Sequence, residues 1–282
     1  MKFAAAVTLY NPTQREIDYI KRYSESFDTI VLFDNSEFPY TKTSNGFDEN
    51  IKVIDGNGNQ GLSVAFNRIF EFLDGQDVDY LCILDQDSIF EEQDISNIKD
   101  FIENASDSNW GIIAPYVKLQ DSDHIREKRF RESKWVIASG SFVNMNILYT
   151  LRIRCDEAYF IDRFEIDLCE QFRQHGYKVI IYYGAVLYQT LGDGHKHPGH
   201  TPLRHYYIFR NRFYFNKKWY GNRKIYRRIL NFLQTGRHLM EIMLFENDKL
   251  KKCKAFFYAI LDYREGKMGK CLELNRFIKK VI

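Results

Sequence analysis

Short apolar runs that alternate with polar, helix-compatible stretches fill the first half of this 282-residue chain and most constrain its fold. Such alternation is typical of βαβ units, so it predicts an α/β fold around a mostly parallel central sheet. We expect helices over 14–26 and 62–73, where apolar residues recur at helical spacing. We expect strands over 4–9, 29–33, 51–54, 80–84 and 111–114.

Polar residues stand directly after these predicted strands. In sheets of this class ligands bind beyond the carboxyl ends of the strands, so the chemistry is expected there. The segments are Tyr10-Asn11-Pro12, Asp34-Asn35-Ser36, Asn59-Gln60-Gly61 and Asp85-Gln86-Asp87-Ser88. The two aspartates of the last segment would offer the oxygen ligands that Mg²⁺ or Mn²⁺ prefers. A solvated turn could have the same sequence as the triplet Asp85-Gln86-Asp87. The motifs around the triplet must therefore decide whether it binds a metal.

Charge divides the chain into two parts. Of 40 lysines and arginines and 38 aspartates and glutamates, residues 203–282 hold 20 and 6, which leaves 20 and 32 for the rest. The front is therefore acidic and the rear strongly basic, although the formal net charge is only +2. A basic rear indicates that this part meets something anionic.

Cysteine spacing and hydropathy argue against several classes of protein. The five cysteines show no paired Cys/His spacing, so we expect neither a zinc site nor a disulfide framework, and a reducing compartment fits best. The apolar start stops at Asn11-Pro12, which is too early for a signal peptide. No stretch reaches the roughly 18 apolar residues that a spanning helix needs. A folded cytoplasmic enzyme is the expected class.

Read in order, the strand-end motifs resemble those of glycosyltransferase family 2, the inverting enzymes built on the GT-A fold. Residues 7–12 resemble the opening strand and loop of the family, and 33–36 resemble its second strand end. Residues 59–67 resemble the NxGxxxAxN segment beside the nucleotide, and 84–88 the LDQDS metal motif of the rhamnosyltransferase-like branch. The resemblance spans about residues 4–215 and implies a Rossmann-like sheet flanked by helices.

This resemblance implies a donor site and a metal site. The nucleotide sugar is expected to contact Tyr10, Asn11, Asp34, Asn59, Gly61, Asn67 and Asp85. Asp87 is the expected direct ligand of Mg²⁺ or Mn²⁺, with Asp85 beside it. Relatives complete the metal shell with a histidine whose place is held here by Gln189. His195, His197 and His200 lie close by and are alternative ligands.

The acceptor side is implied by a small-residue turn. Ser139-Gly140-Ser141 resembles the SGS segment of the family, so Ser139 and Gly140 are expected to contact the acceptor. A tight turn that needs glycine would look the same.

An acidic cluster over 160–167 resembles the motif that carries the base of the family. That base stands eleven residues before a helix-ending glycine, and counting back from Gly176 gives Glu165. Asp167 is the alternative base, and Asp162 is expected to orient or bind the acceptor sugar. A carboxylate here can take the proton of the attacking hydroxyl. Acids in the first turn of a helix also complement its dipole, which is the structural alternative.

Residues 202–211 resemble the RxYYxxRN element of the rhamnosyltransferase-like members. Arg204 and Arg210 are therefore expected to bind the diphosphate of the donor through charge-assisted hydrogen bonds. An ordinary basic surface is the alternative.

We expect a catalytic domain over 1–215, with a nucleotide-sugar half over 1–115 and an acceptor half over 116–215. A basic helical extension follows over 216–282, and Gly236 should weaken or kink one of its helices. The apolar residues on one side of that helix are Ile229, Phe232, Leu233, Met240, Met243 and Leu244. Packing on the catalytic domain, an anionic membrane surface and nucleic acid are the possible roles. The membrane surface ranks first, and no nucleic-acid motif accompanies the charge.

The resemblance implies that rhamnose passes from dTDP-rhamnose to a saccharide acceptor, with inversion. The acceptor would be lipid-linked, at the inner face of the cytoplasmic membrane, in bacterial surface polysaccharide synthesis. Galactofuranose or another hexose from a UDP donor is the alternative. A sugar-1-phosphate nucleotidyltransferase would need a glycine-rich loop where Tyr10-Asn11-Pro12 stands. A non-catalytic basic adaptor is the rival of another class, and the oligomeric state stays open.

Overall fold

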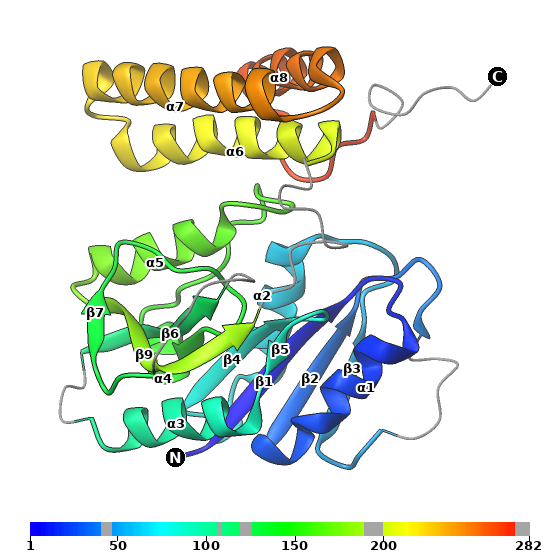
Figure 1. Cartoon of the computed structure of the whole chain (residues 1–282), viewed down its shortest axis with the longest axis vertical. Helices are drawn as coiled ribbons and strands as arrows, with labels where there is room; N and C mark the ends of the chain where they lie inside the picture. The colour runs from blue at the N-terminus through cyan, green and yellow to red at the C-terminus, as the bar shows by residue number, and fades with distance from the viewer. Residues whose placement is uncertain (41–46, 106–108, 119–125, 189–199, 274–282) are drawn as a thin grey trace. The chain divides into compact units, whose positions relative to one another are not determined.

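The computed structural model of this protein describes residues 1–40, 47–105, 109–118, 126–188 and 200–273. The chain divides into two compact units (Figure 1). The first comprises Met1–Cys155 and Glu165–Gly194, and the second Asp156–Phe164 and His195–Ile282. The helical unit begins well before residue 216 because helix α6 (Pro202–Tyr220) packs on the two helices that follow it.

One mixed sheet forms the centre of the first unit, and it confirms the predicted α/β class. Its strand order is β3-β2-β1-β4-β8-β6-β9-β5, with β7 paired to β9. Strands β3, β2, β1 and β4 are parallel to one another, whereas β8, β5 and β7 pair antiparallel. The strands are β1 (Phe3–Leu9), β2 (Thr29–Asp34), β3 (Ile51–Asp55), β4 (Tyr80–Asp85), β5 (Ile89–Phe90), β6 (Trp110–Lys118), β7 (Phe130–Glu132), β8 (Phe142–Asn144) and β9 (Lys178–Tyr188).

Helices cover both faces of this sheet. They are α1 (Gln14–Arg22), α2 (Leu62–Leu73), α3 (Glu92–Glu103), α4 (Met145–Thr150) and α5 (Phe164–Gln174), with a 3₁₀ turn η1 (Ser24–Ser26). The predicted helix over 14–26 ends at Arg22, where the Ser24 hydroxyl donates to the carbonyl of Lys21 at 2.8 Å. Helix α2 has the predicted bounds, and α5 ends before Gly176, whose φ is +84°.

Strand β1 is buried on both faces, which explains its unbroken apolar run. Ala5, Val7 and Leu9 share one core cluster with residues of α1 and α3. Successive side chains of a strand point to opposite faces, so the buried Ala4 and Ala6 face the other side, where α2 packs. Figure 1 shows α1 and α3 in front of the sheet and α2 behind it.

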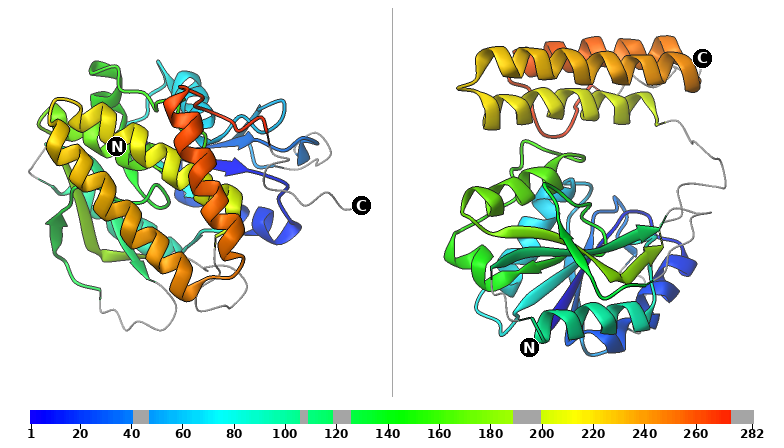
Figure 2. Two further views of the ribbon diagram at one scale, coloured as in Figure 1. Left: turned by 90° about the horizontal axis from the view of Figure 1, so that it is seen from above. Right: turned by 60° about the vertical axis from the view of Figure 1, so that its left-hand side comes forward.

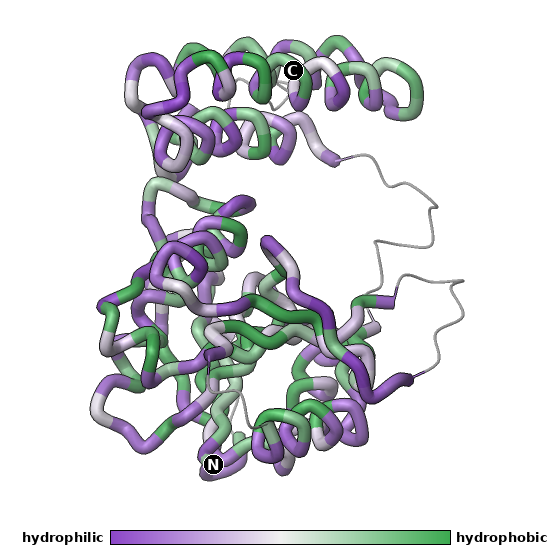
Figure 3. The backbone as a smooth tube through the Cα atoms, turned by 90° about the vertical axis from the view of Figure 1, so that its left-hand side faces the viewer, coloured by the Kyte–Doolittle hydropathy of each residue, from purple (hydrophilic) through white to green (hydrophobic). Residues whose placement is uncertain are grey.

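The second unit is a group of three helices, α6, α7 (Lys224–Phe245) and α8 (Lys249–Arg264) (Figure 2). Tyr206, Tyr207 and Phe209 of α6 form a buried cluster with residues of α7 and α8. Hydrophobic and hydrophilic residues alternate around these helices (Figure 3). Helix α7 continues through Gly236 without a break, and a weakening or kink at Gly236 stays a prediction. None of the helices in the described ranges combines the length with the apolar character that a transmembrane span requires.

Candidate active site

The register of three parallel strands brings the predicted donor residues to one edge of the sheet. Leu9 of β1 pairs with Asp34 of β2, and Thr8 of β1 pairs with Asp85 of β4. Tyr10 follows β1 directly, so it leaves the sheet at the edge that carries both aspartates. Residues from three separate parts of the sequence therefore share the carboxyl edge of the sheet, as the strand-end rule predicts.

Asp34 is fully buried at this edge and orders the loops around it. Its Oδ1 accepts from the backbone N of Ser36 at 3.0 Å, and the Ser36 hydroxyl accepts from the backbone N of Asn11 at 2.8 Å. Asn11 has a φ of +47°, a left-handed conformation that asparagine tolerates better than most residues. The loops after β1 and β2 are thus fixed to each other.

The segment before α2 is fixed to the same edge by Asn35. Its Oδ1 accepts from the backbone N of Gln60 at 2.9 Å, and its Nδ2 donates to the carbonyl of Gly61 at 3.3 Å. The Asn59 side chain accepts from the backbone N of Gly61 at 3.0 Å. Gly61 caps α2 at a φ of +84°, a conformation that favours glycine.

Asn67 has a positioning role. Its Nδ2 donates to the carbonyl of Cys155, and its Oδ1 accepts from the backbone N of Cys155, both at 2.9 Å. The buried amide therefore ties α2 to the end of the segment that follows α4. A direct nucleotide contact by Asn67 stays a prediction.

The middle residue of the Asp85-Gln86-Asp87 triplet links two loops. Gln86 accepts from the backbone N of Tyr10 at 2.7 Å through Oε1 and donates to Glu16 Oε1 at 2.8 Å through Nε2. Glu16 also accepts from the backbone N of Thr13 at 2.6 Å at the start of α1. No role was predicted for Gln86 from the sequence, although it lies within the strand-end segment, and Glu16 was not singled out. The signal available for Gln86 was its position between the two aspartates.

Asp87 is exposed, yet the surrounding protein raises its pKa by desolvation, and the carboxylate of Glu16 raises it further. The side chains at this edge offer oxygen ligands, which fit a hard divalent cation. Among the described residues, no group of three or more His, Cys, Asp or Glu side chains could hold a metal ion by itself. A bound Mg²⁺ or Mn²⁺ would take its other ligands from a diphosphate and water, as is usual for Mg²⁺.

The SGS turn supports the aspartate triplet. The Ser139 hydroxyl accepts from the backbone N of Asp85 at 3.3 Å and forms a short hydrogen bond with the hydroxyl of Ser88. Gly140 has a φ of +78°, and a Cβ there would lie 2.8 Å from Cγ of Pro115. Ser139 and Gly140 therefore position the turn, and their predicted contact with the acceptor stays a prediction.

The two candidate bases stand in the first turn of α5 and differ in burial. Asp167 is fully buried, and its Oδ2 accepts from Nε2 of Gln171 at 3.0 Å. The same Gln171 nitrogen donates to the carbonyl of Arg154 at 2.8 Å. Glu165 is less buried as a residue, although its Oε2 atom lies below the surface. Access for a hydroxyl therefore favours Glu165, while Asp167 braces the start of the helix.

Asp162 lies in the second unit, on a strained segment. Asp162 and Arg163 have φ values of +59° and +78°, which cost non-glycine residues roughly 1–2 kcal/mol each. Asn211 of α6 holds this segment by donating to the carbonyls of Ile161 at 2.7 Å and Asp162 at 3.1 Å. Arg204 Nη2 lies 3.3 Å from Asp162 Oδ1. Such backbone strain is typical of functional sites. Asn211 had no predicted role, although it is the final residue of the RxYYxxRN element and could have been singled out on that ground.

Arg210 is buried inside the helical unit, with 1% of its surface exposed. Its Nη1 donates to the Tyr206 hydroxyl at 2.9 Å, and its Nη2 donates to the carbonyl of Gly269 at 2.6 Å. The guanidinium of Arg210 therefore holds the segment after α8 in place. Because its nitrogens are engaged inside the helical unit, we no longer assign Arg210 a contact with the donor diphosphate. Gln189, His195 and His197 lie outside the described residues, whereas His200 stacks edge-on with His205.

Comparison with known proteins identifies relatives of this chain. The family model Glycosyl transferase family 2 matches residues 17–164, more than half of the chain. The protein dTDP-rhamnosyl transferase RfbF of Shigella flexneri is 24% identical over 234 residues, which cover 74% of this chain and 78% of that protein.

Solved structures share the fold at low sequence identity. TarS of S. aureus, residues 1–349 in complex with UDP-GlcNAc, has a TM-score of 0.58 and 14% identity, with 93% of this chain and 80% of that chain covered. GalNAc-T7 with UDP, GalNAc and Mn²⁺ has a TM-score of 0.55 and 11% identity, with 74% and 47% covered. The fold is therefore the GT-A fold of glycosyltransferases.

Proposed function

This chain belongs to glycosyltransferase family 2, and on that premise we propose that it transfers rhamnose from dTDP-rhamnose to a hydroxyl of a saccharide acceptor, with inversion. The strongest support from the structure is the strand register that gathers Tyr10, Asp34 and Asp85 at one edge of the sheet. The distant likeness to a rhamnosyl transferase supports the choice of sugar. A hexose or galactofuranose from a UDP donor is the alternative.

On the donor side, Asp34 and Asp85 would contact the nucleoside, and the loops at Asn11 and Asn59 would enclose it. These loops are joined to one another through Ser36 and Asn35, so the donor would meet an ordered surface. An ordered surface costs less entropy on binding than one that must be assembled.

Asp87, with Asp85 beside it, would hold a Mg²⁺ or Mn²⁺ ion. The raised pKa of Asp87 and the negative charge of Glu16 support this role. A bound cation would stabilise the ionised form of Asp87 and offset the charge of Glu16. Such an ion, when bound, stabilises the negative charge of the departing nucleoside diphosphate.

Glu165 would act as the base. The acceptor hydroxyl must lose its proton as its oxygen attacks the anomeric carbon, and a carboxylate at the start of α5 that is less buried than Asp167 can accept that proton. Asp167 would keep the helix start in place through Gln171. Asp162 would orient the acceptor, with Arg204 as its partner.

Helices α7 and α8 would attach the protein to the inner face of the cytoplasmic membrane, where a lipid-linked acceptor is found. Apolar side chains on these helices are exposed, in contrast to the buried face of α7 that carries His238 and Ile242. They include Ile229, Phe232, Leu233, Met240, Met243, Leu244, Leu250 and Phe257. Lysines and arginines on the same helices suit an anionic leaflet.

The test is transfer itself. The purified protein would be incubated with Mg²⁺ or Mn²⁺, a lipid-linked saccharide and one of several donors: dTDP-rhamnose, UDP-GlcNAc or UDP-galactofuranose. We expect a rhamnosylated product of inverted anomeric configuration by NMR. A preference for a UDP sugar would select the alternative donor. No product from any donor, with the fold intact, would favour the basic adaptor and overturn the proposal.

A further inference from the structure

A pocket of about 580 Å³ opens in the first unit, between strands β6 and β9 on one side and the end of β7 with the segment that follows it on the other. Its floor comes from Ala114–Val117 of β6 and Ile181 of β9, and its wall from residues 131–137. This volume lies within the usual range for small-molecule sites, about 300–1,000 Å³. None of the residues assigned above to the donor or the metal lines it.

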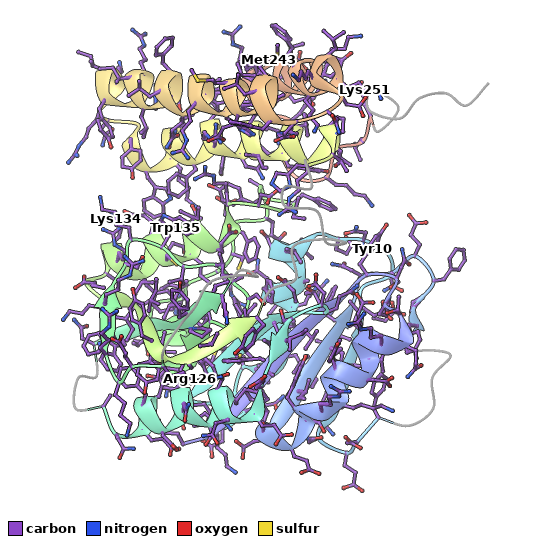
Figure 4. All side chains as sticks on the ribbon, in the orientation of Figure 1. Tyr10, Arg126, Lys134, Trp135, Met243 and Lys251 are labelled. Atoms are coloured by element: carbon purple, nitrogen blue, oxygen red, sulfur yellow. The ribbon has the colours of Figure 1, made fainter. Side chains whose placement is uncertain are left out.

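The wall of the pocket presents an aromatic ring on a fixed backbone. Trp135 is 50% exposed, and its neighbour Val136 is buried. The Ser133 hydroxyl donates to the carbonyl of Trp135 at 2.7 Å, and the Ser133 backbone N donates to the carbonyl of Val179 at 2.8 Å. Figure 4 shows Trp135 next to Lys134 on this segment. The indole is therefore carried by a segment that is already ordered on the sheet.

The pocket adjoins the SGS turn. Pro115 of its floor lies directly against Gly140, and the Ser141 hydroxyl donates to the carbonyl of Ile137 at 2.6 Å. The first residue of the turn, Ser139, accepts a hydrogen bond from the backbone N of Asp85 at 3.3 Å through its hydroxyl. One tight turn thus separates the pocket from the aspartate triplet.

The pocket also adjoins the helix that carries the proposed base. The backbone of Val136 hydrogen-bonds to the thiol of Cys169. Cys169 lies one helical turn after Glu165, and burial raises the pKa of that thiol, with a smaller contribution from the charge of Glu165. Val136 in the wall of the pocket is therefore linked to the helix that carries the proposed base.

The lining of the pocket suits a sugar. Its lining includes the apolar and aromatic residues Tyr116, Val117 and Trp135, and Arg131, Glu132 and Lys134 add charged groups. A sugar ring has a C–H face that packs on an aromatic face, and it has hydroxyls that need polar partners at its edge. A purely apolar ligand would leave these charged groups unused.

We propose that this pocket binds the sugar unit of the acceptor that precedes the one receiving the new glycosidic bond, with Trp135 as its stacking platform. This inference rests on the proposed function, which makes the acceptor a saccharide whose reacting sugar lies at Glu165. It deepens that function by assigning a subsite for a second sugar of the acceptor. Saccharide binding at Trp135 can be measured without donor and without turnover, so its failure is distinguishable from a failure of catalysis.

Binding would be tested first with intrinsic fluorescence. The chain has three tryptophans, and Trp110 is buried. Methyl glycosides, disaccharides and trisaccharides of rhamnose and N-acetylglucosamine serve as probes. We expect a disaccharide or trisaccharide to change the emission of the wild type and of Trp219→Phe, and to leave Trp135→Phe unchanged. Equal responses of both variants, or no response to any saccharide, would overturn the proposal.

Kinetics would then separate this subsite from the reaction centre. Trp135→Ala should raise KM for an acceptor of two or more sugars about tenfold, because one aromatic contact is lost. It should leave kcat, the donor KM and the KM for a single-sugar acceptor unchanged, and Trp135→Phe should restore most of the affinity. A fall in kcat with every acceptor, or binding of a lipid diphosphate without sugar at Trp135, would contradict a saccharide subsite.

Discussion

The side-chain amide of Gln86 donates to the carboxylate of Glu16 at 2.8 Å, across 70 positions of sequence. The same carboxylate accepts from the backbone N of Thr13 and thereby fixes the start of α1. The middle of the aspartate triplet is thus tied to a negative charge, and that charge contributes to the raised pKa of Asp87.

Replacing Glu16 with Gln should therefore change how protons compete with the metal at Asp87. A raised pKa means that protons displace a cation at a higher pH than at an ordinary carboxylate. Glu16→Gln removes one cause of the raised pKa, so the pH midpoint of Mn²⁺ binding should move down. Calorimetric titration of Mn²⁺ with dTDP across pH 4–8 measures this midpoint. Asp18→Asn, on the same helix, is the control, and an equal shift there would refute the role of Glu16.

Substitutions of the two carboxylates of α5 should have different effects, because Glu165 is the proposed base and Asp167 supports the start of the helix. Glu165→Gln should lower kcat by at least about 100-fold while donor affinity and melting temperature stay unchanged. Asp167→Asn should instead destabilise the fold by about 1–2 kcal/mol, because a buried hydrogen-bonded carboxylate at a helix start is altered. If Asp167→Asn alone abolishes transfer in a fully folded protein, Asp167 is the base.

Gly140 offers a matched test of packing under the SGS turn. Gly140 and Gly75 both have a φ of +78°, but a Cβ at Gly75 would meet nothing within 4 Å, whereas one at Gly140 would lie 2.8 Å from Pro115. Both alanine variants pay for the left-handed backbone, roughly 1–2 kcal/mol. Gly140→Ala should lose a further 1–3 kcal/mol or so from overpacking. Urea unfolding compares the two, and equal losses would show that the turn has room to relax.

Acid should weaken the helical unit through His238. Arg212 donates to Nδ1 of His238 at 3.1 Å, so the proton stays on Nε2, which faces Nδ1 of His205 at 3.0 Å. Burial, with the charge of Arg212, lowers the pKa of His238 to about 3.

The unfolded chain binds this proton near pH 6.5, so the stability that neutral His238 contributes is complete above that pH and is lost as the pH falls toward 3. Each pH unit below 6.5 should cost about 1.4 kcal/mol from this residue. His238→Gln should flatten the dependence of unfolding free energy on pH between 7 and 5, whereas the exposed His175→Gln should not. Parallel curves for all three proteins would contradict the assignment.

Exposed apolar residues of α7 should control membrane attachment. Phe232→Glu and Leu244→Glu change side chains that are 77% and 63% exposed, so the fold should persist. Each should reduce binding to vesicles with anionic lipid at least tenfold in a flotation assay, since an apolar contact is replaced by a repelled charge. Phe38→Glu, at an 89% exposed residue of the first unit, is the control. Unchanged binding of the α7 variants would refute attachment through this helix.

The sequence predicted the parts of the fold in which the local pattern and the packing agree. The five apolar runs became β1, β2, β3, β4 and β6, and α2 has the predicted bounds. All of these except β3 are largely buried, and β3 is held by its pairing with β2. The short strands β5, β7 and β8 were missed, since two or three residues carry no period and are held only by their neighbours in the sheet. The grouping of α6 with α7 and α8 was missed for a similar reason, because distant packing decides it.

The candidate site divides in the same way. The strand-end rule located Asp34 and Asp85 because parallel strands share one edge. It could not separate Arg204, which stays half exposed, from Arg210, which is enclosed by its own unit, because both are basic residues on one helix. The pairing of Gln86 with Glu16 was also beyond reach, since nothing local joins two residues so far apart in sequence.

The central claim is that Asp87 supports sugar transfer from a nucleotide donor, and release of nucleoside diphosphate tests it most directly. Wild type, Asp87→Asn and Asp18→Asn would be incubated with dTDP-rhamnose and a lipid-linked saccharide, with Mn²⁺ or with EDTA. We predict that wild type and Asp18→Asn release dTDP only with the ion, and that Asp87→Asn releases at least 100-fold less. Equal release by Asp87→Asn, or release that EDTA does not affect, would contradict the claim.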